Sequence, residues 1–422
     1  MNRKILALLL ACIFVFCAVG CGNTTPSGDG ENEGGETAND LKIGVILIGD
    51  ENEGYTYAHM KGIKDAAAKL NIDPEKDIIW KYTVGENEGC KDAALDLVDN
   101  GCNLVISNSY GHQAFMQEAA AECPDVQFVA MTGDTAANSG LDNFANAFTS
   151  VYQSRYVSGV VAGMKLKELK DAGKIEDKNL DEAGNILVGY VGAYPYAEVV
   201  SGYTAFYLGV KSVVDNVTML VQYTQSWFDI SAESAAADAL LARGCVVICQ
   251  HADSTGAPSA VQAAYEDGAT CFSVGYNIDM LSVAPDVALT SATNNWSVYY
   301  EYLFNAMLNG EKVDTNWSAG YEAGAVEITA LGKACAEGTQ EKVDSVVAAL
   351  KDGSLKVFST DSFTVNGEKL DTCVVDLTGD FDNDDEGDKE AIWDGYFHES
   401  ELRSAPSFSI RIDGILELSD EK

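Results

Sequence analysis

The sequence predicts an α/β fold of two doubly wound, Rossmann-like lobes that face each other across a cleft. Short apolar runs alternate with amphipathic stretches, a pattern typical of parallel strands that helices cover on both faces. The pattern occurs twice, because "LVDNGCNLVISNS" (97–109) and "LLARGCVVICQHADS" (240–254) both read helix, glycine, cysteine, apolar strand and polar loop. Beyond its first 40 residues the chain keeps about 380, enough for two domains.

The N-terminal region predicts a leader and a tether. A positive start at 2–4 precedes an apolar run at 5–19, and "AVGC" ends at Cys21. This pattern is typical of a secretory signal peptide and is similar to the bacterial lipoprotein type. Residues 1–20 would then be removed and Cys21 would carry lipid, with ordinary secretion as the alternative. Residues 21–40 are too polar to fold and would form a flexible tether with a reach of roughly 25 Å. We expect a lipid-anchored protein on the extracytoplasmic face of the cell membrane.

Composition excludes several classes of function. The formal net charge of −38 leaves no basic surface for nucleic acid. No apolar run after the leader is long enough to span a bilayer. Most of the cysteines beyond Cys21 lie beside apolar strand or helix positions. They form no CxxC motif, and the four histidines are scattered along the chain. We therefore expect free core thiols, no metal site and no cofactor. These cysteines are Cys90, Cys102, Cys123, Cys245, Cys249, Cys271, Cys335 and Cys373.

The elements can be placed in chain order. Apolar runs predict strands over 41–49, 77–84, 103–109, 126–133, 186–193, 217–224, 245–251, 271–276 and 287–292. Helical periodicity predicts helices over 57–70, 89–98, 113–121, 152–169, 197–214, 231–242 and 296–308. The resulting partition assigns residues 41–148 and 278–312 to the first lobe, and 149–277 and 313–332 to the second. Crossovers near Thr149, Asn277 and Val313 would act as hinges.

Residues 333–422 differ in character and predict a small C-terminal α+β extension. A helix is expected over 339–352, a small hairpin over 363–370 and an acidic loop over 376–390. The loop does not match a calcium-binding EF-hand, because Asp385 stands where the motif needs glycine and Ala391 where it needs glutamate. A solvated loop is expected, and no pattern in this extension predicts a function.

The loops that follow the predicted strands carry the candidate binding residues. Ligands of doubly wound sheets lie beyond the carboxyl ends of the strands, and those ends combine aromatic side chains with Asp and Asn. Aromatic faces stack on planar bases with ~1–3 kcal/mol per contact, while carboxylates and amides bond to the edges of the base. Two stacking faces and a few hydrogen bonds suffice for micromolar affinity, about −8 kcal/mol. The candidates are Tyr55, Asn108, Tyr110, Asp134, Trp227, Asp253, Asn277 and Asp279.

Four neighbouring side chains are expected to serve the fold. Tyr57, Phe228 and Trp296 are predicted to pack between helix and sheet, and His59 to form a structural hydrogen bond one turn into its helix. Arg155 lies at a helix entry near a hinge, where pairing with a carboxylate and contact with ligand are both open.

A series of motifs carries a resemblance to a known family. "GYTYAH", "SYGH", "QSRYVSGVVAG", "SWFD", "QHAD", "VGYNIDM" and "LTSATNNW" occur in order over roughly residues 41–332. The chain resembles the basic membrane protein family of substrate-binding lipoproteins. This resemblance implies a type I periplasmic-binding protein fold and an ABC importer that takes up purine nucleosides or bases. A permease would be the partner, and the protein is expected to be a monomer.

The resemblance also implies roles for individual residues. Tyr55 matches the aromatic that stacks on the base in the family. Nucleoside-binding members carry Asp at the position of Asn277 and Lys at that of Asn294, where both serve the ribose. The two asparagines here favour a free base such as adenine over a nucleoside.

Three alternatives remain. An enzyme acting on nucleosides is disfavoured, because the chain has no Walker A, GxSxG, HExxH or deaminase zinc motif, and no catalytic residue is expected. A sugar-binding protein of this fold usually uses several arginines, whereas residues 41–332 contain only Arg155 and Arg243. Sensing without transport is not distinguished from import by the sequence. The expected mechanism is closure of both lobes on the ligand.

Overall fold

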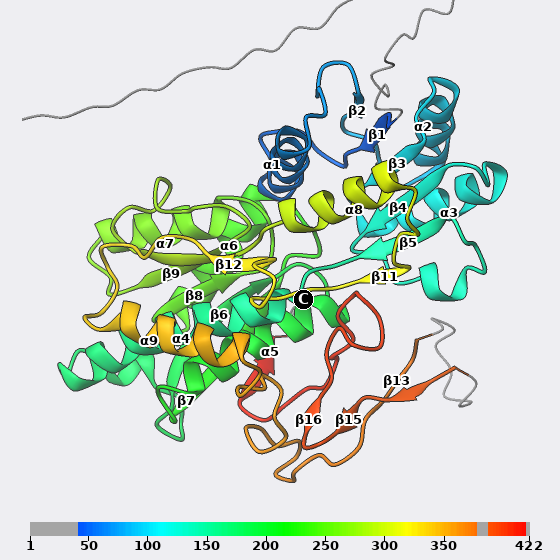
Figure 1. The fold of residues 1–422 in the computed structure, drawn as a ribbon. Helices are drawn as coiled ribbons and strands as arrows, with labels where there is room; N and C mark the ends of the chain where they lie inside the picture. Colours follow the sequence, from blue (N-terminus) through cyan, green and yellow to red (C-terminus); the bar gives the residue numbers. More distant parts are fainter. Residues whose placement is uncertain (1–40, 378–386, 419–422) are drawn as a thin grey trace, which may run out of the picture. The chain divides into compact units, whose positions relative to one another are not determined.

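The computed structural model describes residues 41–377 and 387–418 (Figure 1). The predicted leader, Cys21 and the tether lie outside the described residues, as does most of the predicted acidic loop. Within the described ranges, no helix combines the length and the apolar character that a bilayer crossing requires.

The first sheet has six parallel strands in the order β11-β5-β4-β3-β1-β2. Alternate strand residues point to opposite faces, so Val45 packs in a core with α1 and α8, while Ile46 packs in a second core with α2 and α3. The strands are β1 (Ile43–Ile46), β2 (Ile78–Lys81), β3 (Leu104–Ser107), β4 (Gln127–Met131), β5 (Phe144–Ala147) and β11 (Asn316–Trp317). The helices are α1 (Gly54–Lys69), α2 (Glu88–Asp99), α3 (Gln113–Glu122) and α8 (Ser297–Asn309).

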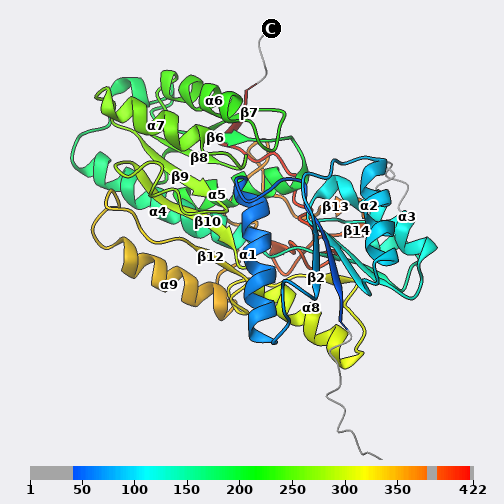
Figure 2. The same cartoon turned by 90° about the horizontal axis from the view of Figure 1, so that it is seen from above.

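The second sheet has seven strands in the order β12-β10-β9-β8-β6-β7-β17, and only β12 pairs antiparallel with its neighbour. Helices α6 and α7 lie on one side of it and α4 on the other (Figure 2). The strands are β6 (Ile186–Gly192), β7 (Val217–Tyr223), β8 (Val247–Gln250), β9 (Phe272–Tyr276), β10 (Ala288–Asn294), β12 (Val326–Ile328) and β17 (Ile415–Glu417). The helices are α4 (Val151–Asp171), α5 (Ala197–Lys211), α6 (Ile230–Ala242) and α7 (Gly256–Glu266).

The two sheets share a central strand order. β2-β1-β3-β4-β5 in the first corresponds to β7-β6-β8-β9-β10 in the second, with additional strands at the edges. The predicted fold class of two doubly wound α/β lobes is therefore confirmed. In both lobes the loops after the central strands emerge at the carboxyl edge, where this topology places ligands.

Two glycines explain how α4 and α5 pack together. A Cβ atom on Gly159 would lie 2.1 Å from the carbonyl oxygen of Phe206, and one on Gly209 would lie 2.1 Å from that of Tyr156. The backbones of the two helices are thus in direct contact, which only residues without a side chain permit. Gly159, the first glycine of the "YVSGVVAG" motif, is therefore required for packing within the second lobe.

The predicted elements are largely present. All nine predicted strands and all predicted helices, including the one over 339–352 (α9, Thr339–Lys351), occur within a few residues of their expected limits. Of the elements in the described ranges that have four or more residues, two were not expected, and the strands of two or three residues (β11 to β17) were not predicted either. β5 consists of four residues, Phe144–Ala147, too short for a clear apolar pattern. α7 begins "GAPSA", and its proline masks the helical pattern although the first helical turn tolerates it.

The predicted lobe limits differ from the sheets at two of three points. β10 lies within the predicted first lobe, but it pairs with β9 in the second sheet. β11 lies within the predicted second lobe, but it pairs with β5 in the first sheet. The chain therefore passes between the sheets at 148–150, 295–296 and 318–325. The limits near Asn277 and Val313 are wrong because an apolar run shows that a strand is buried and does not show which sheet it joins.

The C-terminal region is integrated into the rest of the fold. Helix α9 packs against α4, and β17 extends the second sheet beside β7. Phe397 and Phe408 join the core of the second lobe. The predicted hairpin is a tight turn in which Val365 and Glu368 exchange backbone hydrogen bonds of 2.8 and 3.1 Å. Short strand pairs complete the region: β13 (Val374–Val375) with β14 (Lys389–Glu390), and β15 (Ile392–Trp393) with β16 (Tyr396–Phe397).

Candidate functional site

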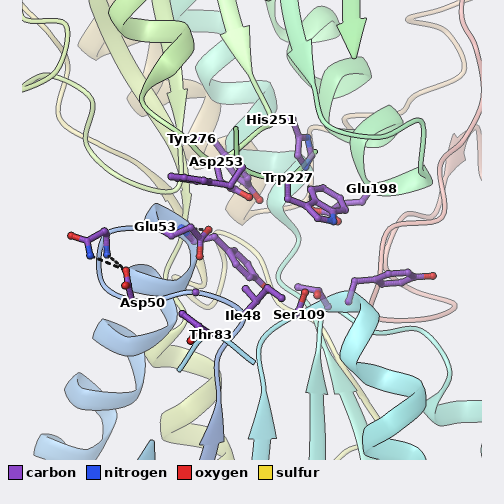
Figure 3. Close-up of a pocket in the computed structure, with 16 residues that line it drawn as sticks. Ile48, Asp50, Glu53, Thr83, Ser109, Glu198, Trp227, His251, Asp253 and Tyr276 are labelled. Carbon is purple, nitrogen blue, oxygen red and sulfur yellow. Dashed lines mark hydrogen bonds and ion pairs between the residues drawn. The ribbon is translucent and has the colours of Figure 1, made fainter. Parts of the chain in front are cut away.

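A cavity of about 330 Å³ lies between the carboxyl edges of the two sheets. Figure 3 shows its side chains converging from the strand ends of both lobes. The first lobe contributes Ile48, Gly49, Asp50, Asn52, Glu53, Tyr55, Thr83, Ser109, Tyr110 and Thr132. The second contributes Glu198, Trp227, Phe228, His251, Asp253 and Tyr276. The volume lies at the lower end of the range typical of small-molecule sites.

Glu53 and Tyr55 form the first-lobe wall at the start of α1. The Glu53 carboxylate accepts hydrogen bonds from the backbone nitrogens of Tyr55 (3.2 Å) and Thr56 (3.0 Å), capping the helix. The cap satisfies both N–H groups, so they are not open to a ligand. Burial raises the pKa of Glu53. The Tyr55 hydroxyl donates to the backbone carbonyl of Asn108, and its ring meets the His59 ring edge-on at 4.6 Å. Tyr55 is therefore held in one orientation beside the cavity.

Asn108 was predicted as a ligand contact and instead supports this wall. Its Oδ1 accepts from the backbone nitrogen of Ile48 at 2.8 Å, and its Nδ2 donates to Thr56 Oγ1 at 3.1 Å. The side chain is buried and does not line the cavity. It fixes the loop after β1 against the start of α1.

Tyr110 lies at the rim of the cavity, and Asp134 lies behind it. The Tyr110 hydroxyl donates to Asp134 Oδ2 at 3.3 Å, and Gln113 Nε2 donates to Asp134 Oδ1 at 3.1 Å. Burial and the Asp134 carboxylate raise the pKa of Tyr110 to about 12. The Tyr110 ring lies 6.3 Å from that of Tyr196 in the opposite lobe. Of these two predicted contacts, only Tyr110 lines the cavity.

The second-lobe wall is largely aromatic. Trp227 packs edge-on against Tyr194 with ring centroids 5.3 Å apart. Phe228, expected to pack between helix and sheet, instead lines the cavity with 40% of its surface exposed. Tyr276 is buried, and the Arg155 guanidinium lies 3.6 Å from its ring centroid. Arg155 also donates to the backbone carbonyl of Gln250 at 2.6 Å, so it supports the wall from behind.

Asp253 is the most buried carboxyl of the cavity wall, with 7% of its surface exposed. Asn277 Nδ2 donates to its Oδ1 at 2.6 Å. Burial, followed by the carboxylates of Glu53, Glu233 and Glu198, raises the pKa of Asp253 well above its usual value. A raised pKa favours the protonated carboxyl, which can both donate and accept hydrogen bonds.

Asn277 and Asp279 do not line this cavity. Asn294 Nδ2 donates to Asn277 Oδ1 at 3.2 Å, and Thr149 Oγ1 donates to Asn294 Oδ1. A polar chain thus runs from the first crossover to Asp253, and Asn277 orients that carboxyl. Asp279 accepts from the backbone nitrogen of Leu281 at 2.8 Å in an exposed turn. Asn277 and Asp279 instead line a separate, smaller cavity of about 200 Å³.

Sequence reasoning missed the Glu198–His251 pair. Nε2 of His251 lies 3.2 Å from Glu198 Oε1, and both residues line the cavity. Burial, aided by the positive charge of Arg155, lowers the pKa of His251 to about 4, so the imidazole is neutral at pH 7. His251 ends the predicted strand over 245–251, and Glu198 lies at the start of the predicted helix over 197–214 that follows another strand. Both therefore lie near the carboxyl end of a predicted strand, and that position was the available signal.

Four carboxyl groups, those of Asp50, Glu53, Glu198 and Asp253, line the cavity, while its described lining contains no lysine or arginine. No cluster of three or more His, Cys, Asp or Glu in the described ranges is arranged to hold a metal ion. The eight cysteines of those ranges are unpaired, five of them buried.

Two parallel α/β lobes that enclose a small cavity at their carboxyl edges define the class of solute-binding proteins with the type I fold. Comparison with family models refines this assignment. The chain belongs to the Bmp family, described as "ABC transporter substrate-binding protein PnrA-like", whose model matches residues 41–357. This confirms the family inferred from the motifs.

Individual relatives agree with the assignment. A purine-binding protein of Brucella abortus is 30% identical over 320 residues, 76% of this chain and 83% of the relative. A putative ABC transporter glucose-binding protein of Haloferax volcanii is 27% identical, covering 80% of this chain and 78% of the relative. The crystal structure of an ABC transporter solute-binding protein from Aeropyrum pernix shares the fold, with a TM-score of 0.62 and 15% identity over 78% of this chain and 94% of that one.

Solute-binding proteins of ABC importers bind a small molecule and a permease, and they act outside the cytoplasm at the membrane. They are not enzymes. The chain is therefore an ABC transporter solute-binding protein of the Bmp family.

Proposed function

We propose that this protein captures a purine base, with adenine favoured, and delivers it as a monomer to an ABC importer. Lipid on Cys21 would hold it at the outer face of the membrane. The observation that carries the proposal is the combination of aromatic faces on both walls with the buried carboxyl of Asp253 at one end of the cavity.

The aromatic residues support a flat ligand. Tyr55 comes from the first lobe, whereas Trp227 and Phe228 come from the second. A planar ring between these walls gains stacking energy from both, ~1–3 kcal/mol per aromatic contact. Such a ligand favours closure, because only the closed arrangement brings both walls against it.

The polar groups support a base with a donor and an acceptor on adjacent positions. An adenine amino group can donate to the carbonyl oxygen of a protonated carboxyl, while a neighbouring ring nitrogen accepts a hydrogen bond from the hydroxyl of the same carboxyl. Asp253 suits this pairing because its pKa is raised. The carboxyl-rich lining without lysine or arginine disfavours anionic ligands such as nucleotides.

The two asparagines support a base over a nucleoside. Asn277 and Asn294 stand where nucleoside-binding members of the family carry the residues for ribose. Here Asn277 bonds to Asp253 and Asn294, and Asn294 also bonds to Thr149. Neither side chain lines the main cavity.

A sugar is the second candidate, because the Haloferax volcanii relative is named as a putative glucose-binding protein and aromatic faces also stack on sugars. The absence of arginine from the described cavity lining argues against it. A purine-binding protein binds a free base that carries no sugar, whereas a sugar-binding protein does not.

The test is a thermal-shift and calorimetric panel of adenine, guanine, adenosine, ribose and glucose. A ligand at a hundredfold excess over its Kd stabilises the folded protein by about 2.7 kcal/mol. We expect adenine to raise the Tm most and ribose and glucose to leave it unchanged. A response to either sugar without a response to any base would overturn the proposal. Incubation with adenosine should release no free base, and release would indicate an enzyme.

The anchor is tested separately. Cys21→Ala should abolish incorporation of radiolabelled fatty acid and release the protein from the membrane fraction, while purified protein keeps its ligand affinity. Retention of label in the variant would exclude lipidation at Cys21.

A further inference from the structure

The segment beyond the family match contacts both lobes. The family model ends at residue 357, and the described residues after it, 358–377 and 387–418, pack beside the second sheet and reach the first (Figure 1). This segment therefore adds a connection between the two lobes that lies outside the part of the chain matched by the family model.

The segment is anchored on the second lobe. The buried Glu399 carboxylate accepts hydrogen bonds from Ser201 Oγ (2.6 Å) and from the backbone nitrogens of Ser407 (3.1 Å) and Phe408 (2.9 Å). Phe408 is fully buried in the second-lobe core, and β17 pairs with β7. The residues between Glu399 and Ser407 are thus held at both ends by the second lobe.

Those residues form the contact with the first lobe. Arg403 Nη1 lies 3.5 Å from Asp134 Oδ2. Ser404 donates from its backbone nitrogen (3.4 Å) and its hydroxyl (3.3 Å) to Asn316 Oδ1 on β11. Ala405 is buried in the core of the first lobe.

The Arg403 contact leads directly to the cavity rim. Asp134 Oδ2, which faces Arg403, also accepts from the hydroxyl of Tyr110, a residue that lines the cavity. The Arg403 and Asp134 side chains are only 14% and 18% exposed, so water and salt screen their attraction less than at an open surface. Backbone carbonyls of Asp376 (3.5 Å) and Pro406 (3.3 Å) accept from the Arg403 guanidinium and fix its orientation.

We propose that Arg403 is a positioning residue for the ligand cleft, which holds Asp134 and through it Tyr110 while tying the second lobe to the first. The ion pair joins the lobes only when they are close, so it stabilises the closed arrangement. Loss of Arg403 frees the Tyr110 rim and favours opening. This inference rests on the proposed function for its ligand and extends it to a segment outside the family match.

The first measurement needs no ligand. Hydrogen exchange of the segments 109–116 and 131–138, which follow β3 and β4, is compared between the wild type, Arg403→Gln and the control Arg411→Gln. Arg411 lies in the same segment, but its partner is Glu417 of the second sheet at 3.1 Å. We expect exchange in both segments to accelerate severalfold in Arg403→Gln and to stay unchanged in Arg411→Gln. Equal exchange in all three proteins would overturn the proposal.

The second measurement is adenine affinity and dissociation rate by stopped-flow fluorescence. Arg403→Gln is expected to weaken binding about fivefold, mainly through faster dissociation, and Arg403→Lys to recover part of the loss. In the Asp134→Asn background, Arg403→Gln should have little further effect, because the pair is already broken. Full additivity of the two substitutions would contradict a shared contact.

The two proposals fail in different ways. If adenine binds neither the wild type nor any variant, the ligand assignment fails. The hydrogen-exchange comparison still decides the role of Arg403. If adenine binds all variants equally and exchange is unchanged, Arg403 has no positioning role and the ligand assignment stands. The melting temperature of each variant shows whether it is folded. If Arg403→Gln is unfolded, Arg403→Lys is measured in its place.

Discussion

The two walls of the cavity differ in how they are built. The first-lobe wall consists mainly of short polar side chains and loop backbone, and its main aromatic, Tyr55, is fixed by Asn108. The second-lobe wall contains Asp253 and His251, which are both buried and have shifted pKa values, together with Trp227. The first wall supplies a fixed surface, whereas the second supplies most of the chemistry.

This contrast follows from the elements behind each wall. In the second lobe, Arg155 lies under Tyr276, and Asn277 orients Asp253, so polar groups are held in a low-dielectric interior. In that environment electrostatic interactions are stronger than in water. Substitutions in the second wall should therefore affect ligand binding more than matched substitutions in the first.

The largest difference is expected between two aspartates. Asp253→Ala should weaken adenine binding at least thirtyfold, about 2 kcal/mol, because it removes a buried hydrogen-bonding group. Asp50→Ala should change the affinity less than threefold, because the Asp50 carboxylate is less buried than that of Asp253 and accepts hydrogen bonds from Asn52 of its own loop. Isothermal titration calorimetry measures both. Similar losses in the two variants would show that the walls contribute equally.

A smaller difference is expected between the aromatics. Trp227→Ala should weaken adenine binding at least tenfold, and Tyr55→Ala by about three- to tenfold, in keeping with the energy of one stacked face. Tyr55→Phe should retain most of the affinity, since its ring remains although the bond to the Asn108 carbonyl is lost. Circular dichroism controls for folding. Unchanged binding in Trp227→Ala and Asp253→Ala together would exclude this cavity as the ligand site.

The smallest effect is on stability and involves Glu233, which lies behind the second wall. Its carboxylate accepts from the backbone nitrogens of Ser254 and Asp229 at 3.1 Å. Burial raises its pKa from 4.5 to about 7. Because the folded pKa exceeds the unfolded one, this stabilising contribution is complete below about pH 4.5 and is lost as the pH rises through about 7.

Glu233→Gln should accordingly flatten the decline in unfolding free energy between pH 5 and pH 8. Urea denaturation at several pH values measures the slope, and Glu341→Gln on the exposed face of α9 is the control. An unchanged slope in Glu233→Gln would mean that its carboxyl titrates alike in the folded and unfolded chain.

The position of a residue after a predicted strand indicated that it lies near the cavity, but it did not indicate the direction in which the side chain points. Tyr55, Tyr110, Trp227 and Asp253 line the cavity as their strand-end positions indicated. Asn277 has an equivalent position, yet its side chain turns towards Asn294 and Asp253. A one-dimensional pattern gives the end of the sheet where a residue lies, while neighbouring side chains decide where it points.

The sequence by itself determined the class of fold, the family and the edge of the sheets at which the candidate cavity lies. Alternation of apolar strands and amphipathic helices is local, and so are motifs such as "SWFD" and "QHAD". Only the tertiary structure decided that β10 joins the second sheet, that Glu198 and His251 meet, and that Arg403 reaches Asp134. These contacts join residues far apart in the chain, and their formation depends on packing that no local pattern encodes.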